Sequence, residues 1–370
     1  MPHLLVVLLL LLTAGSARAT GIDGLAFVPS RLASEVAVID TRSGGVVRRL
    51  PTGSPPLHAA VSDSLRRVIT TSWRGNTVNL IDPDGLLPIE RIPIGVRPDG
   101  IELDPSGRLL AVSSFESDTV ALVDLEARRP LAVLDGFASP HHLTFAPDGR
   151  RLYVSNLAAN HVSVVDVAAL ATVAPIVLGP LEEDLGGVSN LTVTPDGRRL
   201  LATVGNGDRL AVVELPDGQV RDWVRVGDLP WRAFPTMDGR RIIVPNNGDG
   251  TASVLDGETM AELARIPVGG DISSVNTAWF ETIGLVFSRD ARKVTMIGLD
   301  RGERLGDIQL PGTPEAAVVS EDGSRLFVAL SDEGAVAVID VRERRLSSLI
   351  GDVVRRPWSV QIAGSLNYCR

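Results

Sequence analysis

Residues 139–166 read SPHHLTFAPDGRRLYVSNLAANHVSVVD, and this stretch holds most of one unit of a repeat that runs along the chain. A polar start leads into a first apolar strand, Pro-Asp-Gly forms a turn, and a second strand at 152–155 precedes a third at 161–165 that leads to Asp166. Asp and Gly tolerate the positive φ of a tight turn, and Pro fixes its start. The stretch therefore predicts antiparallel strands joined by short turns.

The third strand of this unit, with its acidic end, occurs eight times along the chain. Its copies end at Asp40, Asp82, Asp124, Asp166, Glu214, Asp256, Asp300 and Asp340, at intervals of 40 to 48 residues. Strands such as VAVID at 336–340 are apolar on both faces, as expected for a sheet packed between two neighbours. Four short strands in a unit of this length, repeated around an axis, predict a β-propeller.

The two ends of the chain are expected to share one blade. The first copy has its acidic-ended strand at 35–40, and 25–28 fits the preceding strand, but no first strand comes before them. The segment RPWSVQI at 356–362 matches SPHHLTF at 139–145 and supplies the missing strand. Such pairing removes the free edges of an open array. We therefore predict one all-β propeller domain over 20–370, with eight four-stranded blades; seven blades are the alternative.

The first 19 residues have the pattern of an export signal. Residues 4–12 read LLVVLLLLL and lead to Ala17-Arg18-Ala19, a small-x-small cleavage site. This apolar run is well below the roughly 20 residues that span a bilayer, which favours a signal peptide over a membrane anchor. We therefore expect a periplasmic or secreted bacterial protein whose mature chain has no membrane span.

Composition and motifs narrow the function classes. The 370 residues carry a formal net charge of -9, so nucleic acid is not expected as a partner. Cys369 is the only cysteine, which excludes an intramolecular disulfide and a Cys-x-x-Cys-His site for covalent haem. The sequence has no G-x-S-x-G elbow, phosphate-binding P-loop or H-E-x-x-H motif. These absences favour a non-catalytic protein.

Segments such as SPHHLTFAPDGRRLYVSN followed by HVSVVD resemble the YVTN β-propeller family of exported bacterial proteins, over nearly the whole chain. That family implies a propeller scaffold and no particular activity. Members of that family often have seven blades. A propeller with eight blades instead resembles the d-type haem propellers of cytochrome nitrite reductases and their haem-maturation relatives. Residues 140–156 are also similar to a motif of phosphogluconolactonase-type lactonases, but His141, Ala146 and Leu157 replace its Arg, His and Glu.

The channel mouth is the expected ligand site, because the loops leading into first strands and those joining second to third strands share one face of a propeller. Alignment on the turn glycine gives two rings of residues at the starts of the first strands, which we call the lead-in rings. The first ring contains Leu57, Asp99, His141, Ser189, Trp231, Val275, Glu315 and Trp358, and the second contains His58, Gly100, His142, Asn190, Arg232, Asn276, Ala316 and Ser359. Since successive strand residues face opposite ways, only one ring is expected to point into the channel.

The residues expected to bind a ligand at the mouth are His58, Asp99, His142, Asn190, Trp231, Arg232, Asn276, Glu315 and Trp358. No catalytic residue and no cofactor is assigned. The favoured function is an exported, non-catalytic scaffold that binds an unknown protein or small-molecule ligand. The alternative is noncovalent d-type haem, with His58 or His142 as axial ligand and Arg232 holding a carboxylate, although structural hydrogen bonding also explains such histidines. A propeller lactonase is the second alternative.

Overall fold

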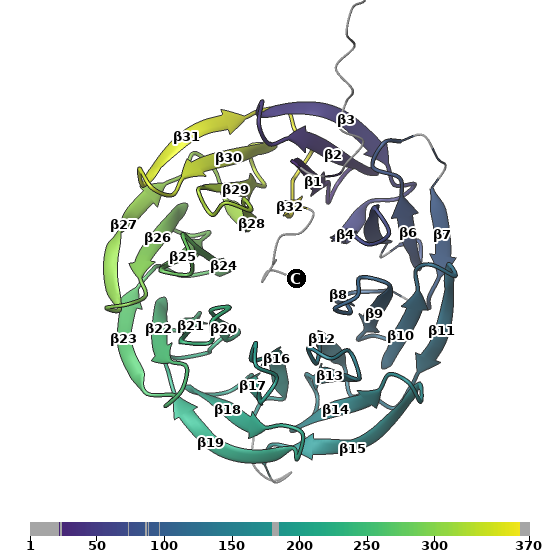
Figure 1. The fold of residues 1–370 in the computed structure, drawn as a ribbon, viewed down its shortest axis with the longest axis vertical. Helices are drawn as coiled ribbons and strands as arrows, with labels where there is room; N and C mark the ends of the chain where they lie inside the picture. The colour runs from purple at the N-terminus through teal and green to yellow at the C-terminus, as the bar shows by residue number, and fades with distance from the viewer. Residues whose placement is uncertain are drawn as a thin grey trace, which may run out of the picture.

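The computed structural model describes residue 22 and residues 24–362, apart from 73, 86, 88, 96 and 180–184. Within them, eight four-stranded antiparallel sheets form a ring around a central axis (Figure 1). The prediction of an all-β, eight-bladed propeller is confirmed, and the seven-blade alternative is wrong. The predicted signal peptide at 1–19 and Cys369 lie outside the described residues. No helix in the described part of the chain is long and apolar enough to cross a membrane.

The blades are numbered in chain order. Blade 1 contains β1 (Leu25–Pro29), β2 (Glu35–Asp40), β3 (Gly45–Pro51) and β32 (Gln361–Ile362), and blade 2 contains β4 (Pro56–Ser62), β5 (Arg67–Ser72), β6 (Thr77–Ile81) and β7 (Glu90–Pro93). Blade 3 contains β8 (Ile101–Leu103), β9 (Leu109–Ser114), β10 (Thr119–Asp124) and β11 (Arg129–Leu134), and blade 4 contains β12 (Pro140–Phe145), β13 (Arg151–Asn156), β14 (His161–Asp166) and β15 (Ala171–Val177). Blade 5 contains β16 (Val188–Val193), β17 (Arg199–Val204), β18 (Arg209–Glu214) and β19 (Gln219–Arg225), and blade 6 contains β20 (Phe234–Pro235), β21 (Arg241–Asn246), β22 (Thr251–Asp256) and β23 (Glu262–Pro267). Blade 7 contains β24 (Ile272–Ala278), β25 (Ile283–Ser288), β26 (Lys293–Gly298) and β27 (Glu303–Gln309), and blade 8 contains β28 (Pro314–Val319), β29 (Arg325–Leu330), β30 (Ala335–Asp340) and β31 (Arg345–Ile350).

The hydrophobic core is divided among the blade interfaces. The described residues form eight buried apolar clusters, and each cluster combines side chains of two neighbouring blades. Leu285 of blade 7, for example, lies in one cluster with Val328 of blade 8, and both are fully buried. Strands that are apolar on both faces therefore bury each face against a different neighbour, as the sequence predicts.

The ring closes where the two ends of the described chain meet. In blade 1 the strand order is β3-β2-β1-β32, and Ala26 and Phe27 of β1 pair with Ile362 and Gln361 of β32. The predicted closure by terminal strands is therefore confirmed. The regular closing strand covers only two residues of the predicted segment 356–362.

Two prolines explain why the first strand is short in blades 1 and 6. In blade 3, the backbone N–H of Ser113 donates to the carbonyl of Gly100 at 2.9 Å. The equivalent residues in blades 1 and 6 are Pro29 and Pro245, which have no N–H to donate. Regular pairing is consequently limited to the two-residue strands β32 and β20, and the residues leading into them form only isolated antiparallel bridges, at Pro357 and Pro230.

The acidic end of the third strand caps the turn to the outer strand. The Oδ1 atom of Asp256 accepts hydrogen bonds from the backbone N–H groups of Glu258 and Thr259 at 3.1 and 2.9 Å. Such backbone hydrogen bonds lower the pKa of Asp256, and likewise of Asp40 and Asp166, below the ordinary value for Asp. These three carboxylates are thus charged at neutral pH, and their role is structural.

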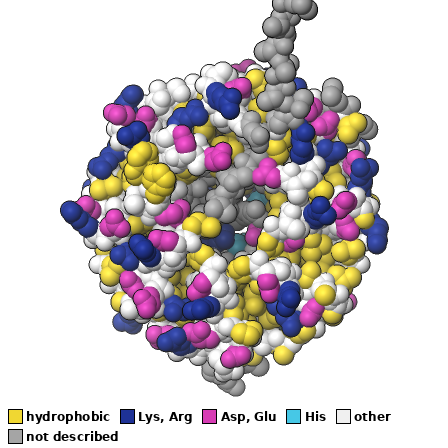
Figure 2. All heavy atoms as spheres, viewed as in Figure 1, with side chains coloured by type: hydrophobic (Ala, Val, Ile, Leu, Met, Phe, Trp, Pro, Cys, Tyr) yellow, Lys and Arg dark blue, Asp and Glu magenta, His cyan; other side chains and the backbone are white. Residues whose placement is uncertain are grey.

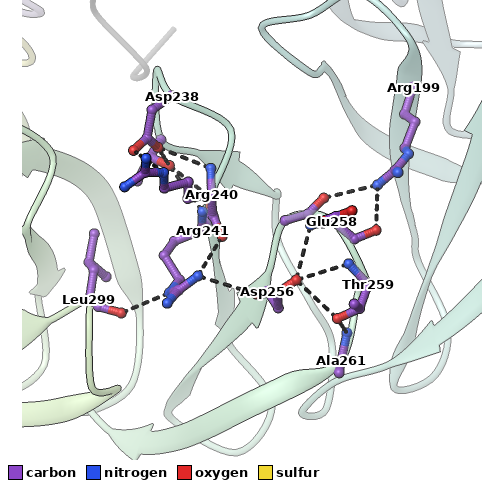
Figure 3. Close-up of polar contacts among 11 residues, drawn as sticks. Arg199, Asp238, Arg240, Arg241, Asp256, Glu258, Thr259, Ala261 and Leu299 are labelled. Carbon is purple, nitrogen blue, oxygen red and sulfur yellow. Dashed lines mark hydrogen bonds and ion pairs between the residues drawn. The ribbon is translucent and has the colours of Figure 1, made fainter.

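Arginines at the start of the second strands of blades 5, 6 and 8 bond to the next blade, as Figure 3 shows for blades 5 to 7. The side chain of Arg241 donates to the carbonyl of Leu299 in blade 7 at 3.0 Å and pairs with Asp256 at 3.3 Å. Arg199 reaches two carbonyls of blade 6, and Arg325 reaches a carbonyl of blade 1 across the closure. Hydrogen bonds with a charged donor are stronger than neutral ones, so these contacts fix neighbouring blades.

Hydroxyl groups connect the blades near the channel. The Oγ atom of Ser155 accepts the backbone N–H of His142 at 2.8 Å and donates to the carbonyl of Ser189 in blade 5 at 3.0 Å. Ser113 and Thr203 make the same two contacts in blades 3 and 5. The starts of the first strands of blades 3 to 6 are therefore linked in series.

Deletion of residues 356–370 removes β32 and is expected to abolish the cooperative thermal transition. The edge of β1 then carries unpaired backbone groups, and the apolar faces beside it lose their cover. Circular dichroism melting and size-exclusion chromatography measure the effect, and deletion of 363–370, which leaves β32 in place, is the control. A 356–370 deletion that melts like the full chain would show that β32 does not hold the ring closed.

Candidate functional site

A β-bulge at the start of most first strands brings both lead-in rings to the mouth. In blade 4, Pro140 pairs with Asn156 and Leu143 with Val154, so two residues oppose one between these pairs. Blades 2, 5, 7 and 8 have a register shift at the same place. A bulge breaks the strict alternation of side chains. The expectation that only one ring points into the channel is therefore wrong.

A cavity of about 140 Å³ lies at the mouth, between residues of blades 1, 2, 6, 7 and 8. Its lining combines both rings and consists of His58, Ala59, Trp231, Ser273, Arg289, Glu315, Ala316, Trp358, Ser359 and Gln361. The structure thus brings four of the nine predicted residues together: His58, Trp231, Glu315 and Trp358. Viewed along the ring axis, the centre of the molecule is hollowed and histidine side chains lie in the hollow (Figure 2).

A larger cleft of about 1110 Å³ adjoins this cavity. The two spaces share Arg289, Glu315 and Trp358 in their walls. The rest of the cleft is lined by Arg31, Leu32, Glu35, Arg49, Thr313, Ser331, Asp332, Glu333, Gly334, Asp352, Val354, Arg355 and Arg356. A ligand that occupies the cavity can therefore extend into a space rich in charged side chains.

The shared wall is built around the carboxylate of Glu315, which is only 4% exposed. Arg289 binds it with two nitrogen atoms, each 2.8 Å from Oε2, and binds Asp271 with a third at 2.8 Å. Burial opposes the charge of Arg289, but Glu315 and Asp271 raise its pKa above the ordinary value. The guanidinium is thus permanently charged and fixed beside Trp358, with 5.7 Å between Cζ and the ring centre.

Arg31 covers the Trp358 ring more closely, with its Cζ atom 3.8 Å from the ring centre. Arg31 and Arg289 occupy equivalent places, directly after the second strands of blades 1 and 7 and the serines that end them. Sequence reasoning missed both arginines because it compared only the lead-in rings. The signal was present, since the same alignment also places the residue after each second strand on the mouth face.

His58 lies beside Asp99, with 4.0 Å between Nε2 and Oδ1. Burial lowers the pKa of His58 below its ordinary value; the charge of Asp99 opposes this shift, and His141 and Arg31 add to it. The neutral imidazole that results can accept a hydrogen bond or coordinate a metal ion through a ring nitrogen.

Three of the other predicted residues lie away from the lining of the cavity, and two of them bond to a neighbouring blade. Asn190 donates to the carbonyl of Trp231 in the next blade at 2.8 Å. Arg232 is 9% exposed and donates to the Thr192 hydroxyl of the preceding blade at 3.1 Å. His142 is 7% exposed, and its backbone N–H is bonded to blade 4 itself. Whether any of them contacts a ligand stays a prediction.

Asn276 does not belong to the second lead-in ring. Ile272 pairs with Ser288 as the first residue of each first strand does elsewhere, so the two ring positions of blade 7 are Ser273 and Ser274. The alignment on the turn glycine is two residues off here, because the turn after β24 contains no glycine. Asn276 instead donates to the carbonyl of Ala317 in blade 8 at 3.3 Å.

The described residues contain no group of three or more His, Cys, Asp and Glu side chains arranged to hold a metal ion. A haem iron needs only one or two protein ligands, so this finding concerns metal centres with three or more protein ligands and does not test the haem alternative. Among the histidines that the structure describes, only His58 lines the 140 Å³ cavity.

With this geometry in place, comparison with known proteins is informative. The YNCE-like β-propeller family model matches residues 56–363. The chain belongs to this family. The predicted relationship to YVTN-type propellers is therefore confirmed. No curated protein is similar enough to match.

Solved structures with the same fold share little sequence with this member of the YNCE-like family. Dihydro-heme d1 dehydrogenase NirN in complex with DHE has 17% identity and a TM-score of 0.79, with 93% of this chain and 76% of that one covered. Apo AztD from Citrobacter koseri has 15% identity and a TM-score of 0.68, covering 93% and 98%. Hydrazine synthase of Kuenenia stuttgartiensis has 20% identity and a TM-score of 0.60, covering 77% and 95%. At these identities, the likeness shows the fold alone.

His58 is expected to titrate below the ordinary histidine pKa of about 6.5. The Asp99→Asn variant should lower the pKa of His58 further, because the carboxylate stabilises the protonated imidazole. NMR titration of the imidazole protons measures both shifts, with the His58→Ala spectrum providing the assignment. Asp104→Asn, which changes a turn-capping carboxylate of the same blade, is the control and should leave the pKa of His58 unchanged. An increase in the Asp99→Asn variant would contradict this electrostatic picture.

Proposed function

We propose that the protein is an exported, non-catalytic propeller that binds a small, flat organic ligand at its channel mouth. The observation that carries the proposal is the single cavity lined by Trp231 and Trp358 from separate blades, together with a few polar groups. Ligand sites are typically concave and largely apolar, with a small number of placed polar side chains. A volume of about 140 Å³ is close to the ~150 Å³ of a cavity known to hold one benzene ring.

The hydroxyl of Ser359 supports a ligand with a polar substituent. Ser359 lines the cavity and is 6% exposed, and its Oγ atom has no hydrogen-bond partner in the described part of the chain. Buried polar groups are normally hydrogen-bonded, and an unsatisfied one costs free energy. A polar ligand atom in the cavity offers the missing partner after a rotation of the serine side chain.

Export and the absence of catalysis rest on separate observations. The signal-like segment at 1–19 supports export. His58 is the one histidine at the cavity, and among the described residues no hydrogen bond joins its side chain to a Ser, Thr or Cys nucleophile. This supports binding without a covalent step, because an activated nucleophile needs a base within hydrogen-bond reach.

The neutral fluorescent compound 2-aminobenzamide is the probe for this proposal. We expect it to bind at a single site, with quenching of tryptophan fluorescence, and we expect Trp358→Ala to weaken binding at least tenfold by removing one wall of the cavity. Trp223→Ala is the matched control, because Trp223 also stacks on an arginine, with Arg209 Cζ 4.5 Å from its ring centre, but lies on the outer strand β19. Equal loss in both variants, or no binding to the unmodified protein, would refute the proposal.

A noncovalent tetrapyrrole is the second candidate, supported by the fold shared with NirN and by His58. The lowered pKa of His58 leaves it neutral near pH 7, as axial coordination of iron requires. The cavity beside His58 has room for one aromatic ring, so a macrocycle would extend beyond it toward the cleft. When bound, the group would supply redox or ligand-binding chemistry, and the chain's own part would be axial ligation by His58 and pairing of acidic substituents with arginines.

Titration with haemin distinguishes this candidate from the first. Binding through His58 should give a Soret shift that saturates at one equivalent and is lost in His58→Ala. The His142→Ala variant is the control, because His142 is buried outside the cavity lining. Unchanged haemin spectra with the unmodified protein would remove the tetrapyrrole candidate, and d-type haem is the second ligand to titrate in the same way.

A further inference from the structure

Three arginines of the cleft have no acidic partner. Arg31, Arg355 and Arg356 form no ion pair within the described ranges, whereas Arg49 pairs with Asp352 at 3.3 Å and Arg289 with Glu315. The unpaired arginines belong to blade 1, from the turn after β1 and from the segment leading into β32. Blade 1 therefore presents positive charge beside the proposed ligand cavity.

Comparison with blade 7 shows that this arrangement departs from the repeat. Arg289 and Asp271 of blade 7 are the positional equivalents of Arg31 and Arg356 in blade 1. In each blade the arginine follows a serine, and Asp271 or Arg356 precedes the residue that pairs with this serine. In blade 7 the two side chains form an ion pair at 2.8 Å. In blade 1, both positions carry a cation.

Comparison with blade 3 leads to the same conclusion. Arg97 and Arg356 both precede a proline in the segment that leads into the first strand, and both have left-handed φ values, 51° and 55°. Arg97 forms an ion pair with Glu116 of its own blade. The residue equivalent to Glu116 in blade 1 is Leu32, which is 53% exposed and lines the cleft. The acid that neutralises this position in blade 3 is thus replaced by an apolar side chain.

The two cations are held close together by their backbone. The N–H of Arg31 donates to the carbonyl of Arg356 at 3.1 Å, and the Ser30 hydroxyl donates to the carbonyl of Arg355. Burial and the charge of Arg356 lower the pKa of Arg31 below its ordinary value, and the charges of Glu315 and Asp99 act in the opposite direction without reversing the shift. Juxtaposed like charges repel, and an anion between them relieves that repulsion.

The acids of the cleft do not fill this role. Glu315, Asp332 and Asp352 are engaged with Arg289, Arg292 and Arg49. Glu35 and Glu333 form no ion pair with the three arginines of blade 1 in the part of the chain that the structure describes. The guanidinium edges of Arg31 and Arg356 are therefore left for an external anion.

We propose that Arg31 and Arg356, assisted by Arg355, bind an oxyanion of the ligand, a carboxylate or a phosphate, while its flat part lies against Trp358 in the cavity. This inference rests on the proposed function and names its ligand class, a planar organic acid. Guanidinium groups recognise carboxylate and phosphate oxygens through paired N–H donors. The stacking of Arg31 on Trp358 fixes one of these donor groups at the border between cleft and cavity.

The test compares 2-aminobenzoate with 2-aminobenzamide, which have nearly the same shape and differ in charge. The unmodified protein should bind the acid about tenfold more tightly, and Arg31→Gln or Arg356→Gln should bring the ratio of dissociation constants close to one. Arg97→Gln is the matched control at the same repeat position and should leave the ratio unchanged. Arg356→Asp, which restores the charge pattern of blade 7, should remove the preference for the acid while keeping or raising the melting temperature.

The outcomes distinguish failure of the oxyanion site from failure of the proposed binding function. If both compounds bind equally and the arginine variants change nothing, the oxyanion site is wrong and the binding propeller stands. If neither compound binds, the proposed function itself fails, and the oxyanion site with it. Displacement of 2-aminobenzoate by phenyl phosphate or by benzoate, measured in parallel, identifies whether phosphate or carboxylate is preferred. Affinities of these two competitors that are unchanged in Arg31→Gln contradict the assignment.

Discussion

Every blade of this propeller is a sheet with two apolar faces, and neither face can be left in water. Each face is covered by a neighbour, so the eight buried clusters of the described residues all lie between blades. A linear stack would leave two faces uncovered, and only a closed ring satisfies all of them. The pairing of β32 with β1 and the arginine contacts between blades follow from this requirement, because they fix neighbours at the spacing that closure at eight blades demands.

Sequence periodicity predicts the fold because the constraint acts on every blade alike. The acidic end of the third strand has one role wherever it is described in detail, so its recurrence marks the blades, as Asp40 and Asp256 show. The mouth was predicted less well, because it depends on departures from the repeat. The bulge in blade 4 breaks the alternation of side chains on which the two-ring prediction depends. The turn after β24 lacks the glycine used for the alignment, so the alignment wrongly assigns Asn276 to the second lead-in ring. Pro29 and Pro245 were visible in the sequence, but their effect on β32 and β20 requires knowledge of which N–H groups pair.

The same positions carry structural residues in some blades and candidate ligand contacts in others. Asn190 and Arg232 bond neighbouring blades, whereas Trp231 and Trp358 line the cavity. The two tryptophans lie in blades 1 and 6, where regular pairing of the first strand is limited to two residues. Blade 1 departs from the repeat by carrying two cations at the positions where blade 7 has an ion pair.

The candidate site lies on the seam of the molecule. Arg31 comes from the beginning of the described chain, and Arg356 and Trp358 come from its end, more than three hundred residues later. These parts meet only when β32 pairs with β1, so the site does not exist while the ring is open. A ligand that bridges these parts binds the closed ring and not the open one, and it therefore stabilises the closed ring by mass action. Ligand binding at the mouth and closure of the ring are therefore linked equilibria.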